Sequence, residues 1–544
     1  MSLWFIVTML VVTAVWCVAV FFRSRYLLHM MQLEGYKNDN FLKWIGENKY
    51  KAYPKKLSMT FNLIAIITVF MGVIVSPYII YIYSVIWIVA ILLSVDFKVE
   101  KTKIALNYTD RAKRLFIANG VVNVVIIALV KIVYFLLVDE FITYMPLVLL
   151  FSALLYYMNP YTLCLANKLI KPIEEKINRG FFDDAKKKVK SFEKLNVVGI
   201  TGSYGKTSVK FITSTILEGA LKTLKTPESY NTPMGVSKTI NGELDETYDA
   251  FVVEMGARNI GDIKEMTELA SPKIGVLTSI GPTHLETFKN IENIMKTKYE
   301  LIDGLPSDGI AIFNYDNQYI KKLSDKTFKE KITYGIENIE DVDIYATDIE
   351  VSEKGSTFTL GYKTGETIKT TTKMLGEHNI SNILAGVAVA KVLGLSLEEI
   401  AGRIGLIESV PHRLQLIIPG TGITIIDDAF NSNPVSSKAA LDVLSKFKEG
   451  RKIIITPGMI ELGEDEAKEN KEFGRNIAKV CDFAILVGPK RTIPIQEGIK
   501  EQGFDENGLF IVDSLDKATQ VLAKLTRPKD VVLFENDLPD NYNE

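Results

Sequence analysis

The ten residues Gly199–Ser208, GITGSYGKTS, bring together the residue types that hold nucleotide phosphates. Glycines allow backbone amides to approach phosphate oxygens, the Lys206 ammonium can reach the terminal phosphates, and the Thr207 hydroxyl is a ligand for magnesium. The general pattern G-x4-G-K-[ST] asks for glycine at position 200, where this sequence has Ile200 and instead spaces its glycines by three, at 199, 202 and 205. A chance glycine-rich turn is the alternative, and the elements around the loop argue against it.

The loop follows a predicted strand and precedes a predicted helix. Leu195–Ile200 is a β-branched run, and residues 209–217, VKFITSTIL, have helical periodicity. This is the strand–loop–helix context that a phosphate-binding loop requires. Short β-branched runs alternate with polar helical stretches to the C-terminus in two series. They predict an α/β central ATP-binding domain over 195–412 and an α/β Rossmann-like domain over 413–544.

The first 158 residues are predicted to form an all-α membrane domain. About five transmembrane helices are expected: Met1–Phe22, two within Leu57–Val95 separated near Pro77, Ile117–Val138 and Phe141–Met158. The first span lacks the basic start and the small-residue cleavage site of a signal peptide, so we expect it to be retained. Lys131, inside the fourth span, fits a lysine that faces other helices or snorkels better than a transport residue.

Basic residues in the loops predict the orientation of these spans. Residues 23–56 contain eight Lys or Arg and residues 96–116 contain six, whereas the breaks near Pro77 and at Asp139–Glu140 contain none. The positive-inside rule then places both basic loops, and everything after about residue 160, in the cytoplasm. Residues 159–194 are predicted to be a helical connector whose lysines face anionic headgroups or solvent. We therefore expect a protein of the cytoplasmic membrane with cytoplasmic catalytic domains.

Composition excludes several function classes. The chain has 544 residues, too many for one hydrophobic core, and its 63 Lys and Arg nearly balance 65 Asp and Glu, which argues against nucleic acid as a partner. Cys17, Cys164 and Cys481 lie far apart and predict neither a disulfide framework nor a zinc site. An ATP-driven transporter would need an LSGGQ-like signature or a second phosphate loop, and a GTPase would need N-K-x-D; the sequence contains none of these.

The loop resembles the T-G-x-x-G-K-[ST] loop of the Mur ligase family, the ATP-dependent amide-bond-forming enzymes of cell-wall peptide assembly. The resemblance extends over nearly all of residues 195–510 through the segments ESYNTPMGV, VVEMGARNIGDI, LTSIGPTHLETF, KTKYELI, FNYDN, LGEHNISNILAG and SVPHRLQ. Two further segments, IIDDAFNSNPVS and TPGMIELG, are most similar to the branch of the family that adds D-alanyl-D-alanine.

The resemblance implies roles for individual residues. Catalytic roles fall to Lys206, Lys298 and Arg413. Nucleotide contacts fall to Gly202, Ser203, Tyr204, Gly205, Lys206, Thr207, Ser208, Asn314, Asp316, His378, Asn379, Asn382, Arg413 and Asp427. Two magnesium ions would be held by Thr207, Glu254, His284 and Lys298, the last as a carbamylated lysine. Substrate contacts fall to Asn231, Thr232, Asn431 and Asn433. For His378, a structural hydrogen-bonding role is an equal alternative.

The implied reaction activates a carboxylate with ATP and joins it to an amine. ATP phosphorylates the carboxylate to an acyl phosphate, and an amino acid or D-alanyl-D-alanine then displaces phosphate to form an amide. The charge on the transferred phosphoryl group would be offset by the two magnesium ions, Lys206 and Arg413. A general base is not evident in the sequence.

Two departures from the family pattern leave the substrates open. The family members that use UDP-linked substrates carry a soluble N-terminal domain that the short stretch before residue 195 cannot contain, so a lipid-linked acceptor is an alternative. The tail VVLFENDLPDNY stands where the D-alanyl-D-alanine branch has a lysine–glycine–serine segment. A membrane-associated poly-γ-glutamate-type ligase is the other enzymatic interpretation, and a membrane-tethered nucleotide-binding scaffold is the non-enzymatic one.

Overall fold

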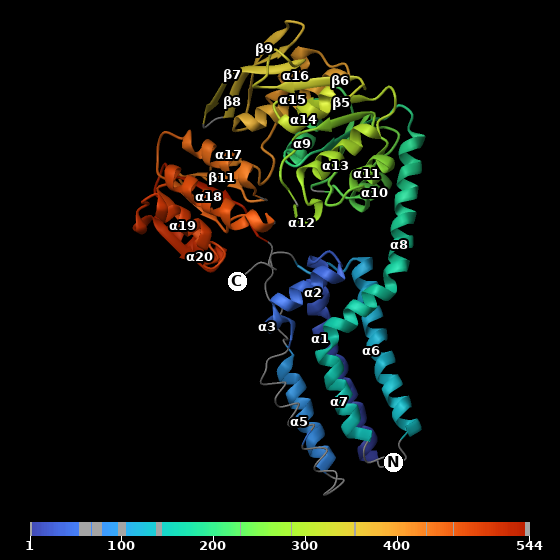
Figure 1. Ribbon diagram of the computed structural model, residues 1–544. Coiled ribbons are helices and arrows are strands. Elements are labelled where there is room, and N and C mark those ends of the chain that lie inside the picture. The colour runs from blue at the N-terminus through green and yellow to red at the C-terminus, as the bar shows by residue number, and fades with distance from the viewer. Residues whose placement is uncertain are drawn as a thin grey trace. The chain divides into compact units, whose positions relative to one another are not determined.

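The structure is a computed structural model that describes residues 3–53, 67, 79–95, 105–137, 144–228, 230–283, 285–352, 355–430, 432–460 and 462–538 (Figure 1). The chain divides into two compact units, one made mainly of Met1–Ile177 and the other mainly of Asn178–Leu538. The first unit is helical, and the second contains both sheets of the protein's described part.

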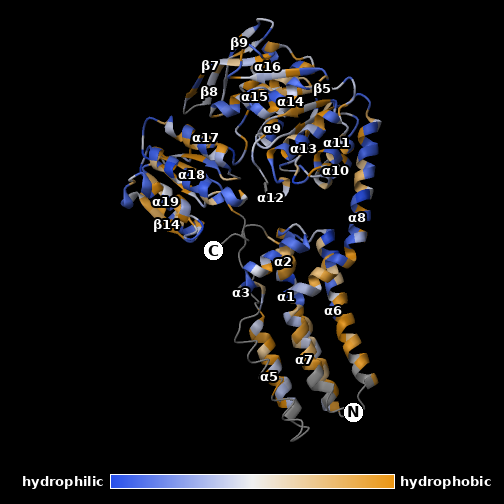
Figure 2. Cartoon of the chain, viewed as in Figure 1, coloured by the Kyte–Doolittle hydropathy of each residue, from blue (hydrophilic) through white to orange (hydrophobic). Residues whose placement is uncertain are grey.

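The first unit is built from helices α1 (Leu3–Leu33), α2 (Asn38–Glu47), α3 (Lys49–Ala52), α5 (Ile79–Ser94), α6 (Asp110–Leu137), α7 (Tyr144–Tyr157) and the first half of α8 (Asn159–Ser191). One hydrophobic core surrounds Trp16, Trp87 and Tyr156, and a second surrounds Leu28 and Phe41. Many large apolar side chains of α1, α5 and α6 are nevertheless exposed, and Figure 2 shows hydrophobic residues along these helices. Exposure of apolar surface on this scale is typical of a membrane-facing region.

Two helices of the described residues are long and apolar enough to cross a membrane, Ile6–Leu33 and Asp110–Val130. A third span is added if α7 and α8, which meet at a 72° bend, count as one broken helix. The prediction of about five spans is therefore supported only in part. Helix α5 has 16 residues, and the first helix of the predicted hairpin, before residue 79, lies outside the described residues apart from Ile67.

Helix α1 continues eleven residues beyond the predicted end of the first span. The apolar run ends before Arg23, but the helix extends to Leu33 because Leu27, Leu28 and Met31 are buried in the second core of this unit. The sequence showed where the charge-free run ended, whereas the packing of the following turns decides where the helix ends.

The second unit begins with a nine-stranded sheet in the order β2-β3-β1-β4-β5-β6-β7-β8-β9. Its strands are β1 (Asn196–Thr201), β2 (Thr223–Lys225), β3 (Ala250–Glu254), β4 (Ile274–Leu277), β5 (Ile310–Asn314), β6 (Lys331–Gly335), β7 (Ile344–Ser352), β8 (Gly355–Tyr362) and β9 (Thr367–Thr372). Along the sheet from β2 to β7, each strand runs parallel to its neighbour. Strand β8 is antiparallel to both β7 and β9. The helices are α9 (Lys206–Leu217), α10 (Pro233–Gly242), α11 (Asp262–Ala270), α12 (Leu285–Phe288), α13 (Ile291–Asp303), α14 (Gln318–Asp325), α15 (Glu377–Val392) and α16 (Leu397–Ile404).

Helices cover both faces of this sheet. One core joins the sheet to α9, α15 and α16 through residues such as Val209, Leu384 and Ile400. The other joins it to α10, α11 and α13 and takes in Phe182 from the second half of α8. The parallel strands, buried on both faces, explain why the β-branched runs are nearly continuous in sequence.

A second sheet of six strands follows in the order β10-β11-β15-β12-β13-β14. Its elements are β10 (Gln415–Ile417), β11 (Thr424–Asp428), α17 (Pro434–Ser445), β12 (Lys452–Thr456), α18 (Glu466–Val480), β13 (Phe483–Val487), α19 (Ile493–Glu501), β14 (Leu509–Val512), α20 (Leu515–Leu525) and β15 (Val531–Glu535), with short 3-10 turns at Gly463–Asp465 and Glu506–Gly508. Only β10 is antiparallel to its neighbour. Two mostly parallel sheets with helices on both faces confirm the predicted α/β class of residues 195–538.

Candidate functional site

The glycine-rich loop lies between the end of β1 and the start of α9, at the carboxyl edge of the large sheet. Two of its glycines are required by space. A Cβ at Gly202 would lie 2.1 Å from Thr278 Oγ1, and a Cβ at Gly205, where φ is +80°, would lie 2.6 Å from Asn382 Oδ1. The loop therefore presses against β4 on one side and α15 on the other, and larger residues at these two positions would force it open.

Hydrogen bonds to the segment after β4 fix the shape of the loop. The Ser203 amide donates to Ser279 O at 2.7 Å, and the Ser203 hydroxyl donates to Gly281 O at 2.9 Å. The Tyr204 amide donates to Ser279 Oγ at 2.9 Å, and its phenol donates to Pro282 O. Burial raises the pKa of the Tyr204 phenol, so it remains a neutral donor.

Lys206 begins α9 and turns back over the loop. Its Nζ donates to Gly202 O at 2.7 Å and to Ser203 O at 3.1 Å, so the ammonium occupies the concave side of the loop. Burial lowers the pKa of Lys206; Glu254 opposes that effect and the positive charge of Arg413 adds to it. Because the positive charges of Lys206 and Arg413 repel each other, the site favours an anionic ligand such as phosphate, which would offset both charges.

Glu254 ends β3 next to the loop and is 1% exposed. Its Oε1 accepts hydrogen bonds from Thr207 Oγ1 at 3.1 Å and from Asn231 Nδ2 at 3.0 Å. Adjacent oxygen ligands of an octahedral Mg²⁺, each at about 2.0–2.1 Å, lie about 2.9 Å apart, so the Thr207 and Glu254 oxygens fit such a pair. No group of three His, Cys, Asp or Glu converges within the described ranges. One carboxylate, a hydroxyl and substrate phosphates nevertheless form a usual magnesium set.

Lys298 lies in α13 and is 3% exposed. Desolvation lowers the pKa of Lys298 well below its usual value, and the neighbouring Lys206 lowers it further, against weaker effects of Asp262 and Glu300. A lowered pKa raises the fraction of neutral amine, which is the form that reacts with CO2. The residue therefore fits the chemistry of carbamylation, which a protonated surface lysine would not.

The predicted base-contacting residues, Asn314 and Asp316, lie at and just after the carboxyl end of β5. Asn314 Nδ2 donates to Thr278 O at 2.9 Å and lies 3.4 Å from Ser381 Oγ, which links β5 to α15. The Asp316 carboxylate accepts from the amides of Ile336 and Glu337, so in this structure Asp316 anchors the loop after β6. Sequence spacing could not reveal that role because the donors lie twenty residues further along the chain.

The amino-terminal part of α15 approaches the phosphate loop through Asn382, in the second turn of the helix. Asn379 Nδ2 donates to Leu375 O at 2.8 Å, and Asn382 Nδ2 donates to Asn379 Oδ1 at 3.3 Å, which leaves Asn382 Oδ1 directed at Gly205. His378 is exposed in the first turn of this helix. Asn379 is thus a structural residue of the helix start, and Asn382 is the member of this motif that contacts the loop.

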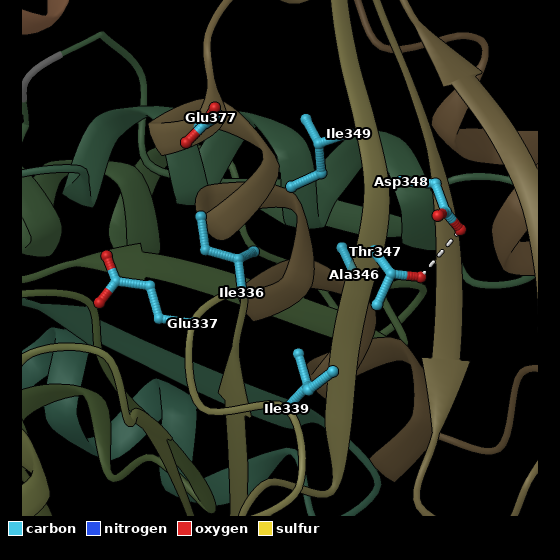
Figure 3. A pocket seen from close by; sticks show the side chains of 8 residues that line it. All are labelled: Ile336, Glu337, Ile339, Ala346, Thr347, Asp348, Ile349 and Glu377. Atoms are coloured by element: carbon cyan, nitrogen blue, oxygen red, sulfur yellow. Dashed lines mark hydrogen bonds between the residues drawn. The ribbon is translucent and has the colours of Figure 1, made fainter.

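A hollow of about 260 Å³ lies beside β7 of the large sheet, next to the loop that follows β6 (Figure 3). It is lined by Ile336, Glu337, Ile339, Ala346, Thr347, Asp348, Ile349 and Glu377. Asp348 sits at a bulge of β7 with φ +50°, and its carboxylate lies 3.1 Å from Thr347 Oγ1. The hollow contains none of the predicted site residues, although it adjoins the loop that Asp316 anchors.

Arg413 lies just before β10 and is half-buried. Its guanidinium stacks over the Phe430 ring at 4.6 Å, and burial lowers its pKa against the opposing effects of Asp428, Glu254 and Glu535. An arginine between carboxylates of both sheets stays charged and can pair with an incoming phosphate. The carboxylate of the neighbouring Asp427 is hydrogen-bonded to His412, with Asp427 Oδ2 2.8 Å from His412 Nδ1.

Two predicted substrate residues act as helix caps. Thr232 Oγ1 accepts from the Gly235 amide at the start of α10, and Asn433 Oδ1 accepts from the Val435 and Ser436 amides at the start of α17. Such caps stabilise the first turn of a helix by about 1 kcal/mol. Asn231, in contrast, reaches Glu254, while His284 and Asn431 lie outside the described residues.

Sequence reasoning missed a buried pair of carboxyls at the edge of the smaller sheet. Asp428 and Glu535 end the adjacent strands β11 and β15 and face each other in register. Ser432 Oγ donates to Glu535 Oε1 at 2.5 Å. Desolvation raises the pKa of Asp428 to about 6, and desolvation together with Asp428 raises that of Glu535 well above its usual value. The unusual tail segment FEND was the signal that could have found this pair.

Glu535→Gln is expected to reduce the loss of thermal stability between pH 5 and pH 8. The folded state raises the pKa of Glu535, so its favourable contribution is present at low pH and is lost as pH rises above the unfolded value near 4.5. The neutral amide removes this dependence and keeps the oxygen that accepts from Ser432. The fall in Tm over this interval should shrink by about 2–4 °C, measured by scanning calorimetry.

Glu501→Gln is the matched control for this experiment. Glu501 is a surface residue whose pKa is lowered by Lys471 and Arg475, so its pairing is fully formed throughout this pH interval. That variant should show the wild-type pH dependence. An unchanged pH dependence in Glu535→Gln would mean that Glu535 does not retain a proton in the folded protein.

Family models match both of the chain's α/β domains. Residues 200–390 match the Mur ligase middle domain, and residues 412–535 match the Mur ligase, glutamate ligase domain. These two ranges contain the phosphate loop, Glu254 and Lys298 in the first domain and Arg413 in the second.

Relatives and solved structures give the same assignment. The UDP-N-acetylmuramoyl-tripeptide–D-alanyl-D-alanine ligase of Mycobacterium tuberculosis is 31% identical over 362 residues, which cover 63% of this chain and 70% of that protein. MurF from Acinetobacter baumannii superposes with a TM-score of 0.60 at 26% identity, covering 66% of this chain and 77% of that one. MurF from Thermotoga maritima in complex with ADP gives 0.59 at 25% identity, covering 66% and 80%. The chain belongs to the Mur ligase family.

Proposed function

We propose that this chain is an ATP-dependent ligase of peptidoglycan precursor synthesis that joins D-alanyl-D-alanine to a muramoyl tripeptide. The observation that carries the proposal is the convergence of Lys206, Thr207 and Glu254 at one loop, with Lys298 buried in the same charge environment. The relatives named above are D-alanyl-D-alanine ligases of such tripeptides, and the sequence similarity extends through both catalytic domains.

The proposed reaction uses the residues of the loop to bind and orient ATP. The acceptor carboxylate attacks the γ-phosphorus, ADP leaves, and the amine of D-alanyl-D-alanine attacks the resulting acyl carbon, after which phosphate and a proton leave. Loop amides and Lys206 hold the phosphates, while Arg413 offsets charge on the transferred group. Magnesium, held by Thr207 and Glu254, would supply further charge neutralisation when bound.

We further propose that Lys298 functions as a carbamate. Its buried, neutral amine would react with CO2 to give an anionic oxygen donor, and His284 would complete the set for a second magnesium ion. The remaining predicted nucleotide contacts, including Asn314, Asn382 and Asp427, are proposed on the family resemblance. Of these, Asn382 has the strongest geometric support because it contacts the phosphate loop.

The proposed location is the cytoplasmic membrane, with both catalytic domains in the cytoplasm. Two spanning-length apolar helices and the basic loops that flank them support this orientation. Residues 1–158 would form the membrane domain, 159–194 the connector, and 195–412 and 413–544 the two catalytic domains. Anchoring at the bilayer would raise the local concentration of a lipid-linked acceptor, so we propose such an acceptor beside the UDP-linked one.

The test is an activity assay on the full-length protein in detergent. We expect phosphate release that requires ATP, Mg²⁺, D-alanyl-D-alanine and a muramoyl tripeptide, offered separately as its UDP-linked and its lipid-linked form. A higher kcat/KM for the lipid-linked form would support the membrane-acceptor proposal. Turnover with glutamate, but with neither muramoyl acceptor, would replace the proposal by a poly-γ-glutamate-type activity. ATP binding without turnover of any substrate would instead support the interpretation as a membrane-tethered nucleotide-binding scaffold.

A further inference from the structure

Lys210 is a buried lysine that the reaction described above does not use. It lies one helical turn after Lys206 in α9 and is 0% exposed. Its Nζ lies 3.1 Å from Glu254 Oε2, donates to Glu228 O and lies 5.0 Å from the centre of the Phe211 ring. The ammonium group therefore has an ion-pair partner, a carbonyl acceptor and an aromatic ring around it.

The carbonyl that Lys210 binds belongs to a strained part of the chain. Glu228 is a non-glycine residue with φ +38°, in the left-handed region that side chains other than glycine rarely adopt. Such conformations persist only where surrounding contacts hold them. The lysine donates directly to this residue's carbonyl, so it is one of the contacts that hold the conformation.

Glu254 holds the same segment at two other points. The Glu254 amide donates to Thr226 Oγ1 at 3.2 Å, and its carboxylate accepts from Asn231 Nδ2 at 3.0 Å. The ion pair with Lys210 completes this set of contacts, so Thr226, Glu228 and Asn231 are attached to α9 and β3 through one lysine and one glutamate. Gly256 N adds a bond to Asn231 O at 2.8 Å.

We propose that Lys210 is a positioning residue that fixes the segment around Glu228 and Asn231 for the peptide acceptor and at the same time limits the negative charge that Glu254 offers to magnesium. This inference rests on the proposed function for its substrate. The two effects have opposite signs on removal of the lysine charge. The segment loses a contact and binds the acceptor less well, whereas Glu254 loses a competing cation and binds magnesium more tightly.

Lys210→Met tests the proposal because methionine keeps the apolar stem and removes the charge and the donors. The apparent KM for the muramoyl acceptor should rise about tenfold, as expected for the loss of a charged hydrogen bond, with a smaller change in kcat. The Mg²⁺ concentration that half-saturates ADP binding, measured by calorimetry, should fall about threefold to tenfold. A purely structural defect would weaken both acceptor and magnesium binding, and that parallel loss would overturn the proposal.

Hydrogen exchange gives a readout that does not depend on activity. Amides in the peptide covering residues 226–232 should exchange about tenfold faster in Lys210→Met than in the wild type. Lys225→Met is the matched control, because Lys225 lies 5.6 Å from the same Phe211 ring but pairs with the surface residue Glu218. Unchanged exchange in Lys210→Met would overturn the proposal even if the chain turned over none of the offered acceptors.

A double variant covers the case in which Lys210→Met does not fold. Removing one partner of a buried ion pair leaves an uncompensated charge, which Glu254→Gln removes. Exchange of residues 226–232 in Lys210→Met/Glu254→Gln should then be faster than in Glu254→Gln alone. Equal exchange in these two variants would show that Lys210 does not hold the segment.

Discussion

Replacing Lys206 with methionine is expected to lower kcat for ATP-dependent phosphate release by about 10²- to 10³-fold, the usual effect of removing one preorganised charge from a developing anion. The Lys206 ammonium lies on the concave side of the loop, 2.7 Å from Gly202 O and 3.1 Å from Ser203 O. A phosphate group would take over the ammonium from these two carbonyls, so the residue is poised to follow charge on the γ-phosphate. Steady-state kinetics with saturating acceptor would measure the loss.

The Lys206 variant must be separated from a general collapse of the loop. Gly202 and Gly205 fix the loop against β4 and α15, and neither contact involves the lysine side chain. The Tm of Lys206→Met should therefore remain close to that of the wild type, and Lys225→Met, which changes a surface lysine of β2, should retain full activity. If Lys206→Met kept wild-type kcat with an intact fold, the assignment of this loop to the transferred phosphate would be wrong.

The phosphate loop was predictable because its function depends on local sequence. The strand, the glycine spacing and the helix start all lie within Leu195–Leu217, and the structure places β1, the loop and α9 there. The pairing of Thr207 with Glu254 needed more than local information. It follows from the register of β1 beside β3, which brings Ile200 opposite Glu254. Before the structure, only the family resemblance indicated Glu254 as a magnesium ligand beside Thr207.

Residues that act through distant contacts were not predictable in the same way. The sequence pattern assigned no role to Lys210, although its position four residues after Lys206 puts it on the same helical face. Its burial depends on Glu228 and Glu254, which come from other elements. Asn433 has a second role that its motif did not reveal. Its side-chain oxygen caps α17, and the substrate contact that the motif implied stays a prediction.

The membrane region was the least predictable part for a physical reason. Hydropathy reports the length of an apolar run, whereas a helix ends where packing and hydrogen bonding stop supporting it. Helix α1 therefore continues past Arg23 into the core around Leu28, whereas α7 ends at Tyr157, next to the predicted end at Met158. Charge counts in the loops do not depend on these ends, so the predicted orientation is less sensitive to them than the number of spans.

Activity that depends on dissolved CO2 is the second large effect we expect, and it should disappear in Lys298→Met. Burial lowers the pKa of the Lys298 amine well below its usual value, which raises the fraction of the neutral form that can add CO2 to form a carbamate. Its positive form would face Lys206 and repel it, whereas the carbamate would attract it. Carbamylation therefore converts an unfavourable pair of cations into a favourable pair of opposite charges.

Lys298→Met should lower kcat by about 10²- to 10³-fold, since a ligand that helps to stabilise transition-state charge contributes several kcal/mol. In CO2-free buffer the wild type should lose activity and regain it on addition of bicarbonate, and the variant should not respond. Labelling with ¹³C-bicarbonate should give a carbamate NMR signal in the wild type and none in Lys298→Met. Lys296→Met, an exposed lysine two residues earlier in α13, is the matched control and should behave as the wild type in all three measurements.

The two expected losses differ in a way that separates their causes. Lys206 acts as a fixed cation, so its loss should not be repaired by bicarbonate, whereas wild-type activity that needs Lys298 should follow the CO2 concentration. The dependence should also strengthen as pH falls, because protonation of the Lys298 amine competes with carbamate formation and the lowered pKa only delays that competition. Activity of the wild type that is independent of CO2 at every pH, together with loss of activity in Lys298→Met, would assign Lys298 to packing beside the loop and remove the carbamate from the mechanism.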